Sequence, residues 1–468
     1  MMHWLSPRAW RTSAALFGLL LSLAPTLAHA QEASPAAPAA ATAAAPTADA
    51  AATVAPVFDS GDTAWIVVSA ALVLLMTPGL AFFYGGMVRR KNVLGTLMQS
   101  FIAMGVITVI WVVCGYSLGF SEGGPFIGGL KWAFLNGVSA SEVSPYYMDR
   151  GKGTIPHQLY MVFQMMFAII TPALISGAFA ERKKFSAYLL FITLWSLVVY
   201  IPIAHWVWGS DGWLYKLGAL DFAGGTVVHI SSGVTALVAA LFIGKRQGYP
   251  HEEMRPHDLP MTLLGTGLLW FGWFGFNGGS SLAADGLGVA AFVNTHVAAG
   301  AAMLVWVLLE WSMKGKPTAL GAASGAVAGL VGITPAAGFV NVIGALAIGA
   351  LACAACYFAS VVVKPKLGYD DSLDTFGVHG VGGTVGAILT GVFAVKSFAN
   401  VGANGLLYGD PGLVVKQLIG VGATWAYAGA MSLILLVVVD KALGLRVKKE
   451  AEFSGLDLTQ HGEAAYSM

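Results

Sequence analysis

The feature that most limits the fold of this chain is a succession of long apolar stretches separated by short polar joints, beginning near Thr63. About 20 apolar residues are enough to cross the hydrocarbon core of a membrane as a helix. Eleven stretches are predicted, at 63–87, 93–119, 157–180, 185–207, 223–244, 259–279, 287–311, 319–334, 338–363, 375–395 and 411–440. The chain is 57% hydrophobic and 10% charged, unlike a soluble globular domain. The sequence therefore predicts an all-α polytopic membrane protein with its transmembrane domain at 59–440.

The N-terminal segment is excluded from this domain. Residues 1–30 contain a positively charged start, a short apolar run and the tripeptide Ala28-His-Ala30, a pattern typical of a cleaved signal peptide. Cleavage after Ala30 would leave the mature N-terminus outside, and an uncleaved first helix is the alternative. Residues 31–58 are almost wholly Ala, Pro and Thr, a composition that predicts a disordered, Ala/Pro-rich periplasmic tail.

The distribution of positive charge predicts the orientation of the chain. If the first stretch starts outside, the inner joints hold seventeen Lys and Arg residues and the outer joints hold six. The outer six are Lys131, Arg150, Lys152, Lys216, Lys396 and Lys416. Loops rich in Lys and Arg stay in the cytoplasm. We therefore expect a multi-pass membrane protein, surrounded by lipid, whose C-terminal tail at 441–468 is cytoplasmic.

Two related segments place a histidine inside an apolar stretch. Asp221 precedes His229 by eight residues, and Asp371 precedes His379 by the same interval, in the fifth and tenth stretches. This spacing suggests two repeats of five helices plus one extra, and because five is odd the repeats must be inverted. Inverted-repeat transporters place their sites near the bilayer midplane, where we expect the histidines to meet. Asp221 and Asp371 are expected to cap the helices that follow, with Asp374 as an alternative cap for the tenth.

A histidine inside an apolar helix suggests a function when a second one matches it. A single such histidine is ordinarily a core residue, whereas two in matching positions of opposed repeats favour a pathway or a relay. No metal or cofactor is expected, because zinc needs three or four ligands and neither the histidines nor Cys353-Ala-Ala-Cys356 have further ligands nearby. The net charge of +1 suggests no nucleic acid partner. Two neutral imidazoles can share a proton and line a narrow path for a small hydrogen-bonding solute.

Several long motifs, in order along the chain, carry a resemblance to a known family. They are Ala178-Phe-Ala-Glu-Arg182, Tyr200-Ile-Pro-Ile-Ala-His-Trp-Val-Trp-Gly209, Leu220-Asp-Phe-Ala-Gly-Gly-Thr-Val-Val-His-Ile230, Trp273-Phe-Gly-Phe-Asn277, Phe376-Gly-Val-His-Gly-Val381 and the tail at 452–466. Over about residues 60–468 the chain closely resembles the bacterial ammonium transporters of the Amt/Mep/Rh family. The resemblance implies a homotrimer with a pore in each subunit, and a tail that engages a cytoplasmic PII-type (GlnK-like) regulator.

The family pattern also assigns roles to particular residues of this chain. They are Trp208 and Ser280 for substrate recruitment at the outer face, Phe167 and Phe276 for a hydrophobic gate, His229 and His379 for a proton relay in the pore, and Asp221 for a structural role. The stretch between Trp208 and Asp221 is one residue longer than in the family pattern, and Trp206 is a second aromatic residue there. Without the resemblance, ordinary packing would explain the phenylalanines and the interfacial aromatic belt would explain the tryptophan.

The expected function is transport of ammonium. An indole face attracts a cation, and a constriction of two phenyl rings excludes water. Because a full charge is too costly to carry through such a constriction, ammonium would give up its proton and ammonia would pass between the histidines. Potassium has no proton to give. An ammonia gas channel or an ammonium sensor on the same fold is the alternative, and an enzyme is disfavoured because no nucleophile lies beside the histidines in the sequence.

Overall fold

The computed structural model describes residues 58–146, 153–399 and 402–466, and in these ranges the protein is helical with no β-sheet. The predicted signal peptide at 1–30 and nearly all of the predicted tail at 31–58 lie outside them. Ten helical segments are long and apolar enough to cross a membrane. They are Ser60–Met87, Arg90–Phe120, His157–Phe179, Phe185–Leu217, Gly225–Ile243, Leu259–Ser281, Gly286–Lys314, Val342–Leu367, Phe376–Phe393 and Gly412–Leu443.

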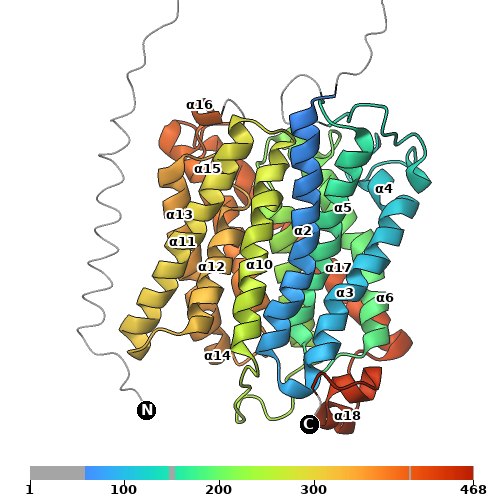
Figure 1. Cartoon of the computed structure of the whole chain (residues 1–468), viewed down its shortest axis with the longest axis vertical. Coiled ribbons are helices and arrows are strands. Elements are labelled where there is room, and N and C mark those ends of the chain that lie inside the picture. Colours follow the sequence, from blue (N-terminus) through green and yellow to red (C-terminus); the bar gives the residue numbers. More distant parts are fainter. Residues whose placement is uncertain (1–57, 147–152, 400–401, 467–468) are drawn as a thin grey trace, which may run out of the picture.

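Each of these segments coincides with one predicted stretch, and the remaining prediction, 319–334, corresponds to a shorter apolar helix, Ala319–Ile333. The helices are α2 (Ser60–Met87), α3 (Val93–Ile110), α4 (Tyr116–Phe120), α5 (His157–Ile175), α6 (Phe185–Trp195), α7 (Ile201–Trp208), α8 (Trp213–Leu217), α9 (Ser231–Ile243), α10 (Leu259–Gly278), α11 (Gly286–Lys314), α12 (Ala319–Ile333), α13 (Val342–Tyr357), α14 (Lys364–Leu367), α15 (Val381–Phe393), α16 (Lys396–Ala399), α17 (Gly412–Leu443) and α18 (Lys449–Ser454). The long helices run side by side as one bundle, with α16 at one end and α14 and α18 at the other (Figure 1).

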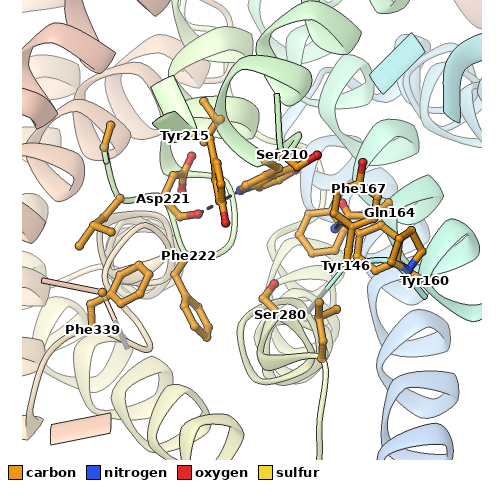
Figure 2. Close-up of a pocket in the computed structure, with 17 residues that line it drawn as sticks. Tyr146, Tyr160, Gln164, Phe167, Ser210, Tyr215, Asp221, Phe222, Ser280 and Phe339 are labelled. Atoms are coloured by element: carbon orange, nitrogen blue, oxygen red, sulfur yellow. Dashed lines mark hydrogen bonds between the residues drawn. The ribbon is translucent and has the colours of Figure 1, made fainter. Parts of the chain in front are cut away.

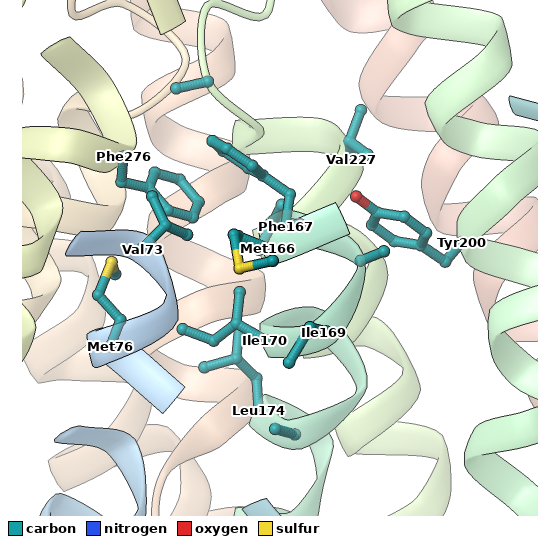
Figure 3. Packing of buried hydrophobic residues seen from close by; sticks show 14 of the residues in the cluster. Val73, Met76, Met166, Phe167, Ile169, Ile170, Leu174, Tyr200, Val227 and Phe276 are labelled. Carbon is teal, nitrogen blue, oxygen red and sulfur yellow. The ribbon is translucent and has the colours of Figure 1, made fainter. Parts of the chain in front are cut away.

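The core of the bundle is built around α5, whose apolar segment is 94% buried. Met166, Phe167 and Ile170 of this helix pack against Met76 of α2 and Phe276 of α10, as Figure 3 shows. Burial of large apolar side chains on all faces of α5 means that it contacts other helices rather than lipid. The walls of any passage through the molecule are therefore fixed by close packing around this helix.

Glycine explains how α12 approaches α11. Gly321, Gly325 and Gly329 recur every four residues, and a Cβ atom on Gly325 or Gly329 would lie 2.6 Å or 2.5 Å from the Cβ of Trp306 or Ala302 on α11. Any side chain at these positions would force the helices apart. Small residues are typical of places where membrane helices meet closely.

An ion network joins the connections at the α18 end of the bundle. Arg246 donates from Nε and Nη2 to the two oxygens of Asp370, at 2.9 and 2.8 Å, and Arg89 donates from Nε to Glu181 at 2.7 Å. Burial raises the pKa of both carboxyls, but the guanidinium groups outweigh it and hold each pKa below its usual value. These pairs connect joints that are far apart in sequence, so they fix the helix ends relative to one another.

Candidate functional site

A cavity of about 340 Å³, here called the aromatic cavity, is lined by residues of α5, α7 and α8 and by residues that follow α10. Its aromatic lining consists of Tyr146, Tyr160, Phe167, Trp208, Tyr215, Phe222 and Phe339, and its polar lining includes Gln164, Ser210, Asp221 and Ser280 (Figure 2). Trp208 and Ser280, which the sequence assigned to recruitment, therefore share one cavity. Trp206 does not line it, because its indole donates to the carbonyl of Phe126 and packs on Tyr427.

Two phenylalanine rings in tilted contact lie beside this cavity, and Phe167 of the pair lines it. The rings of Phe167 and Phe276 have centroids 4.3 Å apart at an angle of 36°, and both side chains are almost fully buried. The indole of Trp208 meets Phe167 edge to face at 5.9 Å and donates from Nε1 to the carbonyl of Asp221 at 3.0 Å. This hydrogen bond fixes the indole, so that Trp208, Phe167 and Phe276 form one continuous aromatic surface.

The two histidines meet beyond the phenylalanine pair. Nδ1 of His229 and Nδ1 of His379 are 3.2 Å apart, and the rings stack with centroids 5.3 Å apart at 22°. A hydrogen bond needs one donor and one acceptor, and a neutral imidazole carries one N–H, so two neutral rings in this contact must be opposite tautomers. Nε2 of His229 is buried and has no hydrogen-bond partner among the described residues. The contact therefore holds one proton between the two rings, and Nε2 of His229 stays without a protein partner in the described ranges.

The space beside the histidines is small and apolar. A cavity of about 10 Å³ is lined by both histidines, Phe276, Trp273 and aliphatic side chains, and it has room for roughly one water-sized molecule. A third cavity, of about 170 Å³, is also lined by His379 and continues past Asp374 toward the α18 end. The three cavities follow one another from the aromatic cavity, through the small space beside the histidines, to the cavity near Asp374. This order is expected for a pathway through the bundle.

Asp221 caps the turn that carries His229. Its carboxylate accepts hydrogen bonds from the backbone N–H groups of Gly224, Gly225, Thr226 and Val227, at 2.6 to 3.1 Å. Burial raises the pKa of Asp221, and the hydrogen bonds lower it in part. The acid thus satisfies donors that the start of a helix leaves free.

Asp371 has the equivalent position before His379 and accepts fewer backbone hydrogen bonds than Asp221 does. It accepts from the backbone N–H of Phe376 at 2.7 Å, and burial, together with the nearby Asp374 carboxylate, raises the pKa of Asp371 to about 6. Asp374, the alternative cap, instead pairs with Lys364 at 2.5 Å. The structure therefore favours Asp371 as the cap of the tenth segment.

Comparison with known proteins places the chain in a family. The model of the Ammonium Transporter Family matches residues 64–466. The chain belongs to this family. It is 52% identical over 406 residues to an ammonium transporter of Bacillus subtilis, covering 87% of this chain and 98% of the relative. It is 49% identical over 412 residues to Ammonium transporter Amt1 of Archaeoglobus fulgidus, covering 87% and 99%.

Solved structures of the ammonium transporter family share the fold. The crystal structure of Candida albicans Mep2 is 37% identical, covers 87% of this chain and 90% of its own, and superposes with a TM-score of 0.79. A protein described as a sensor Amt protein is 28% identical and has a TM-score of 0.79 over 86% of this chain. The all-helical architecture is thus the Amt/Mep architecture, and it is shared by Mep2 and by a protein described as a sensor.

Family membership does not by itself identify two further residues beside the pathway. Trp273 stacks on His229 with ring centroids 5.4 Å apart at 23° and donates to Thr334 Oγ1 at 2.9 Å, which holds the indole in place. Gln164 lines the aromatic cavity with an amide oxygen that accepts no hydrogen bond in the described part of the chain. The only sequence signal for Gln164 was a polar amide among apolar residues of a membrane span. No group of three potential metal-binding side chains occurs among the described residues.

Proposed function

We propose that this protein carries ammonium across a membrane by binding it in the aromatic cavity, removing its proton and passing ammonia between His229 and His379. The observation that carries the proposal is the contact between these buried histidines on an otherwise apolar path. Its support from the comparisons is that curated relatives covering most of the chain are named ammonium transporters.

Recruitment would depend on the aromatic cavity. The face of the Trp208 indole attracts a cation by about 1–2 kcal/mol when water is partly removed. Ser280 donates its hydroxyl proton to the carbonyl of Phe276 at 2.7 Å, so the lone pairs of its oxygen remain to accept an N–H of ammonium. A cation is held here before it meets the phenyl rings.

Selectivity would arise at the gate of Phe167 and Phe276. Moving a bare charge between two buried phenyl rings costs many kcal/mol, because nothing there replaces its water. Ammonium avoids this cost by giving up a proton, whereas potassium, of similar size, has none to give. The histidines then offer ammonia a hydrogen-bonding lining, and their shared proton provides a relay. Asp221 and Asp371 hold the two turns in position.

The wider assembly is part of the same proposal. Three spans, Arg90–Phe120, Gly286–Lys314 and Gly412–Leu443, have only about a third or less of their most apolar windows buried within the chain, which suits contact with lipid or with neighbouring subunits. We infer an inverted five-plus-five repeat with an eleventh helix, a homotrimer in a bacterial inner membrane, an outside N-terminus and a cytoplasmic tail that meets a PII-type regulator.

Paired ammonium and potassium currents in reconstituted membranes test the mechanism. His229→Asp replaces a proton-sharing ring by a carboxylate that can coordinate a bare cation, so this variant should begin to admit potassium, which the native protein excludes. His229→Ala/His379→Ala should leave a dry apolar gap and lose the ammonium-driven current. If the double-alanine protein keeps the native ammonium current and still excludes potassium, the histidines are packing residues and the mechanism is wrong.

The same measurements distinguish the alternatives that the fold allows. A gas channel would raise the internal pH of liposomes in an ammonia gradient without any current. A sensor would bind ammonium with no flux of either kind, and the 28% identical sensor Amt protein is the reason to include this outcome. A current that follows the ammonium gradient excludes both.

A further inference from the structure

A glutamine near the start of α17 makes three hydrogen bonds inside the bundle. Only a third of the most apolar window of its span is buried within the chain, yet the side chain of Gln417 is 3% exposed. Its Oε1 accepts from the backbone N–H of Leu220 at 2.6 Å, and its Nε2 donates to the carbonyls of Leu220 and Ala387 at 2.8 and 2.9 Å. The opposite orientation of the amide would set its oxygen against two carbonyls, so these contacts determine the orientation. A polar side chain buried in a membrane span suggests a role beyond packing.

Leu220 depends on this amide because the chain has no helix or strand there. Residues 219–224 connect α8 to the turn Gly225–Ile230, and neither backbone group of Leu220 has a backbone partner among the described residues. Backbone groups that are shielded from water need a hydrogen-bond partner. The side chain of Gln417 therefore replaces the regular structure that this segment lacks.

The segment held in this way is a wall of the aromatic cavity. Residues 220–222 all line the cavity, as Figure 2 shows for Asp221 and Phe222. The carbonyl of Asp221 accepts the indole N–H of Trp208 at 3.0 Å, and the backbone N–H of Phe222 donates to the carbonyl of Pro335 at 3.1 Å. The position of this wall, and of the indole attached to it, is thus fixed by contacts at both of its ends.

The contact between the histidines is fixed separately. A Cβ atom on Gly233 would lie 2.1 Å from the backbone nitrogen of Gly380, so the two elements that carry the histidines already touch there. The carboxylate of Asp221 accepts only from residues 224–227 of its own turn, which can keep its form if Leu220 moves. Loss of the Gln417 amide should therefore displace the cavity wall and leave the histidine pair in place.

We propose that Gln417 is a positioning residue that anchors the 220–222 wall of the aromatic cavity to α15 and α17, and so sets the ammonium concentration at which transport is half-maximal. Gln417 lines none of the three cavities described above, so it acts through the backbone of Leu220. Ala387, its third partner, lies on α15, the helix that follows His379. The effect on transport rests on the proposed function, whereas the anchoring of Leu220 does not.

Ammonium-driven currents over a series of ammonium concentrations test this role. Gln417→Leu keeps the approximate size of the side chain and removes all three hydrogen bonds. The half-saturating concentration should rise about tenfold while the maximal current stays within about threefold of native, because the cavity wall loses its anchor and the histidines do not. A role in folding alone would instead lower the maximal current at an unchanged half-saturating concentration, and that result overturns the proposal.

Ser432→Ala is the matched control on the same helix. Ser432 is fully buried, and its Oγ lies 3.2 Å from Trp195 Nε1 and 2.8 Å from Thr235 Oγ1, none of which lines the aromatic cavity. This variant also removes a polar contact between α17 and its neighbours, but it should keep the native half-saturating concentration. Equal increases in Ser432→Ala and Gln417→Leu contradict a specific role of Gln417.

A second substitution covers the case in which Gln417→Leu does not fold, as judged by gel filtration. Gln417→Glu keeps the shape of the side chain and an acceptor for the N–H of Leu220, but a carboxylate has no donor for the two carbonyls. Its half-saturating concentration should also rise, and a native value overturns the proposal.

Hydrogen exchange measured by mass spectrometry reports the anchoring without any transport. In Gln417→Leu, peptides that contain Leu220 should exchange at least about tenfold faster than in the native protein, whereas peptides from α9 (Ser231–Ile243) should keep their native rates. Native exchange at Leu220 refutes the anchor. Faster exchange with a native half-saturating concentration refutes the positioning role and leaves the transport function intact. Faster exchange in a protein whose native form moves no ammonium refutes the transport function and leaves the anchor standing.

Discussion

At the scale of single residues, the contact between Nδ1 of His229 and Nδ1 of His379 restricts where protons can lie. If His379 donates, His229 must carry its own proton on Nε2, and if His229 donates, its Nε2 is a bare acceptor. In either arrangement, Nε2 of His229 lacks a partner among the described residues, so it is available to a passing molecule as donor or acceptor. To pass from the first state to the second, the shared proton moves from His379 to His229 while Nε2 of His379 gains a proton and Nε2 of His229 loses one. A proton delivered to one outer nitrogen and released from the other would therefore complete a relay.

Lys183 is a buried cation that the proposed pathway does not use. Its side chain is 1% exposed, and its Nζ lies 3.8 Å and 4.1 Å from the ring centroids of Phe179 and Phe191. Nζ donates no hydrogen bond within the described ranges, and burial lowers the pKa of Lys183 well below its usual value. Because the unfolded chain then binds the proton more tightly than the folded chain, stability should rise as the pH increases toward the ordinary lysine range.

Lys183→Met should therefore raise the free energy of unfolding by about 1–2 kcal/mol at neutral pH, since apolar replacements of buried ionic groups are often stabilising. The variant should also lose the rise in stability between pH 7 and 10. Thermal unfolding in detergent across this pH range measures both effects. Lys184→Met, at the neighbouring residue whose Nζ donates to the carbonyl of Leu443, is the matched control and should keep the pH slope. A lower melting temperature for Lys183→Met would show that the ammonium–aromatic contacts outweigh the desolvation.

The sequence anticipated some residues of the site and missed others for a physical reason. The histidines and both caps were predictable because a polar group in an apolar span, repeated at the same spacing, is seldom a matter of packing alone. Gln164 lies within Phe163-Gln-Met-Met-Phe167, and its significance depends on which atoms surround its amide. The same is true of Trp273, whose stacking on His229 joins α10 to the helical turn Gly225–Ile230 through a contact that the apolar pattern does not record.

At the scale of elements, the two helices that carry the histidines approach each other closely at glycine residues. Gly233 lies four residues after His229, and a Cβ atom on it would be 2.1 Å from the backbone nitrogen of Gly380. Gly383 lies four residues after His379, and a Cβ atom there would be 2.9 Å from the Cβ of His229. These matching close approaches set the distance between the rings, and they are what two related halves would produce.

Gly233→Ala should separate these two elements, because backbone atoms cannot move aside as a flexible side chain can. We expect the ammonium-driven current to fall at least tenfold, with a lower melting temperature. Gly267→Ala is the control: Gly267 lies in α10, a Cβ atom there meets nothing within 4 Å, and alanine favours a helix by about 1 kcal/mol. Native currents in Gly233→Ala, together with native currents in Gly267→Ala, would show that the helix crossing does not control the pathway.

The positions of the helices were predictable, but their internal irregularities were not. The sixth stretch was predicted at 259–279 and is observed at Leu259–Ser281, because an apolar run of membrane length leaves little freedom. His229 and His379, however, lie on π-helical turns, Gly225–Ile230 and Phe376–Gly380. Such turns are frequent at functional sites, and they arise from tertiary contacts that an apolar pattern does not record.

At the scale of the whole molecule, the C-terminal tail joins helices that would otherwise be independent at the α18 end. Asp457 accepts from the backbone N–H of Gly95 at 2.8 Å, and the N–H of Leu456 donates to Asn92 at 2.9 Å. Glu452 pairs with Arg446 at 2.8 Å. In Figure 1, α18 lies beside the start of α3, at the same end as α14. The tail is thus an ordered part of that surface, close to the far end of the proposed pathway.

Removal of residues 450–468 should therefore change both transport and its control. The deletion eliminates the contacts of Glu452, Leu456 and Asp457 with the α18 end, so this surface loses the form that we propose a PII-type trimer recognises when it covers the cytoplasmic exits. We expect truncated protein to lose at least tenfold in affinity for a PII-type protein and to show ammonium uptake that the added regulator no longer inhibits. Uptake into liposomes and pull-down with the regulator measure the two effects.

Leu458→Ala, at a side chain that is 64% exposed, tests whether the regulator binds the exposed tail itself or the surface that the tail organises. Native regulator binding by Leu458→Ala with loss in the truncated protein points to the organised surface, whereas unaltered uptake and unaltered binding after truncation would contradict any role of the tail in regulation.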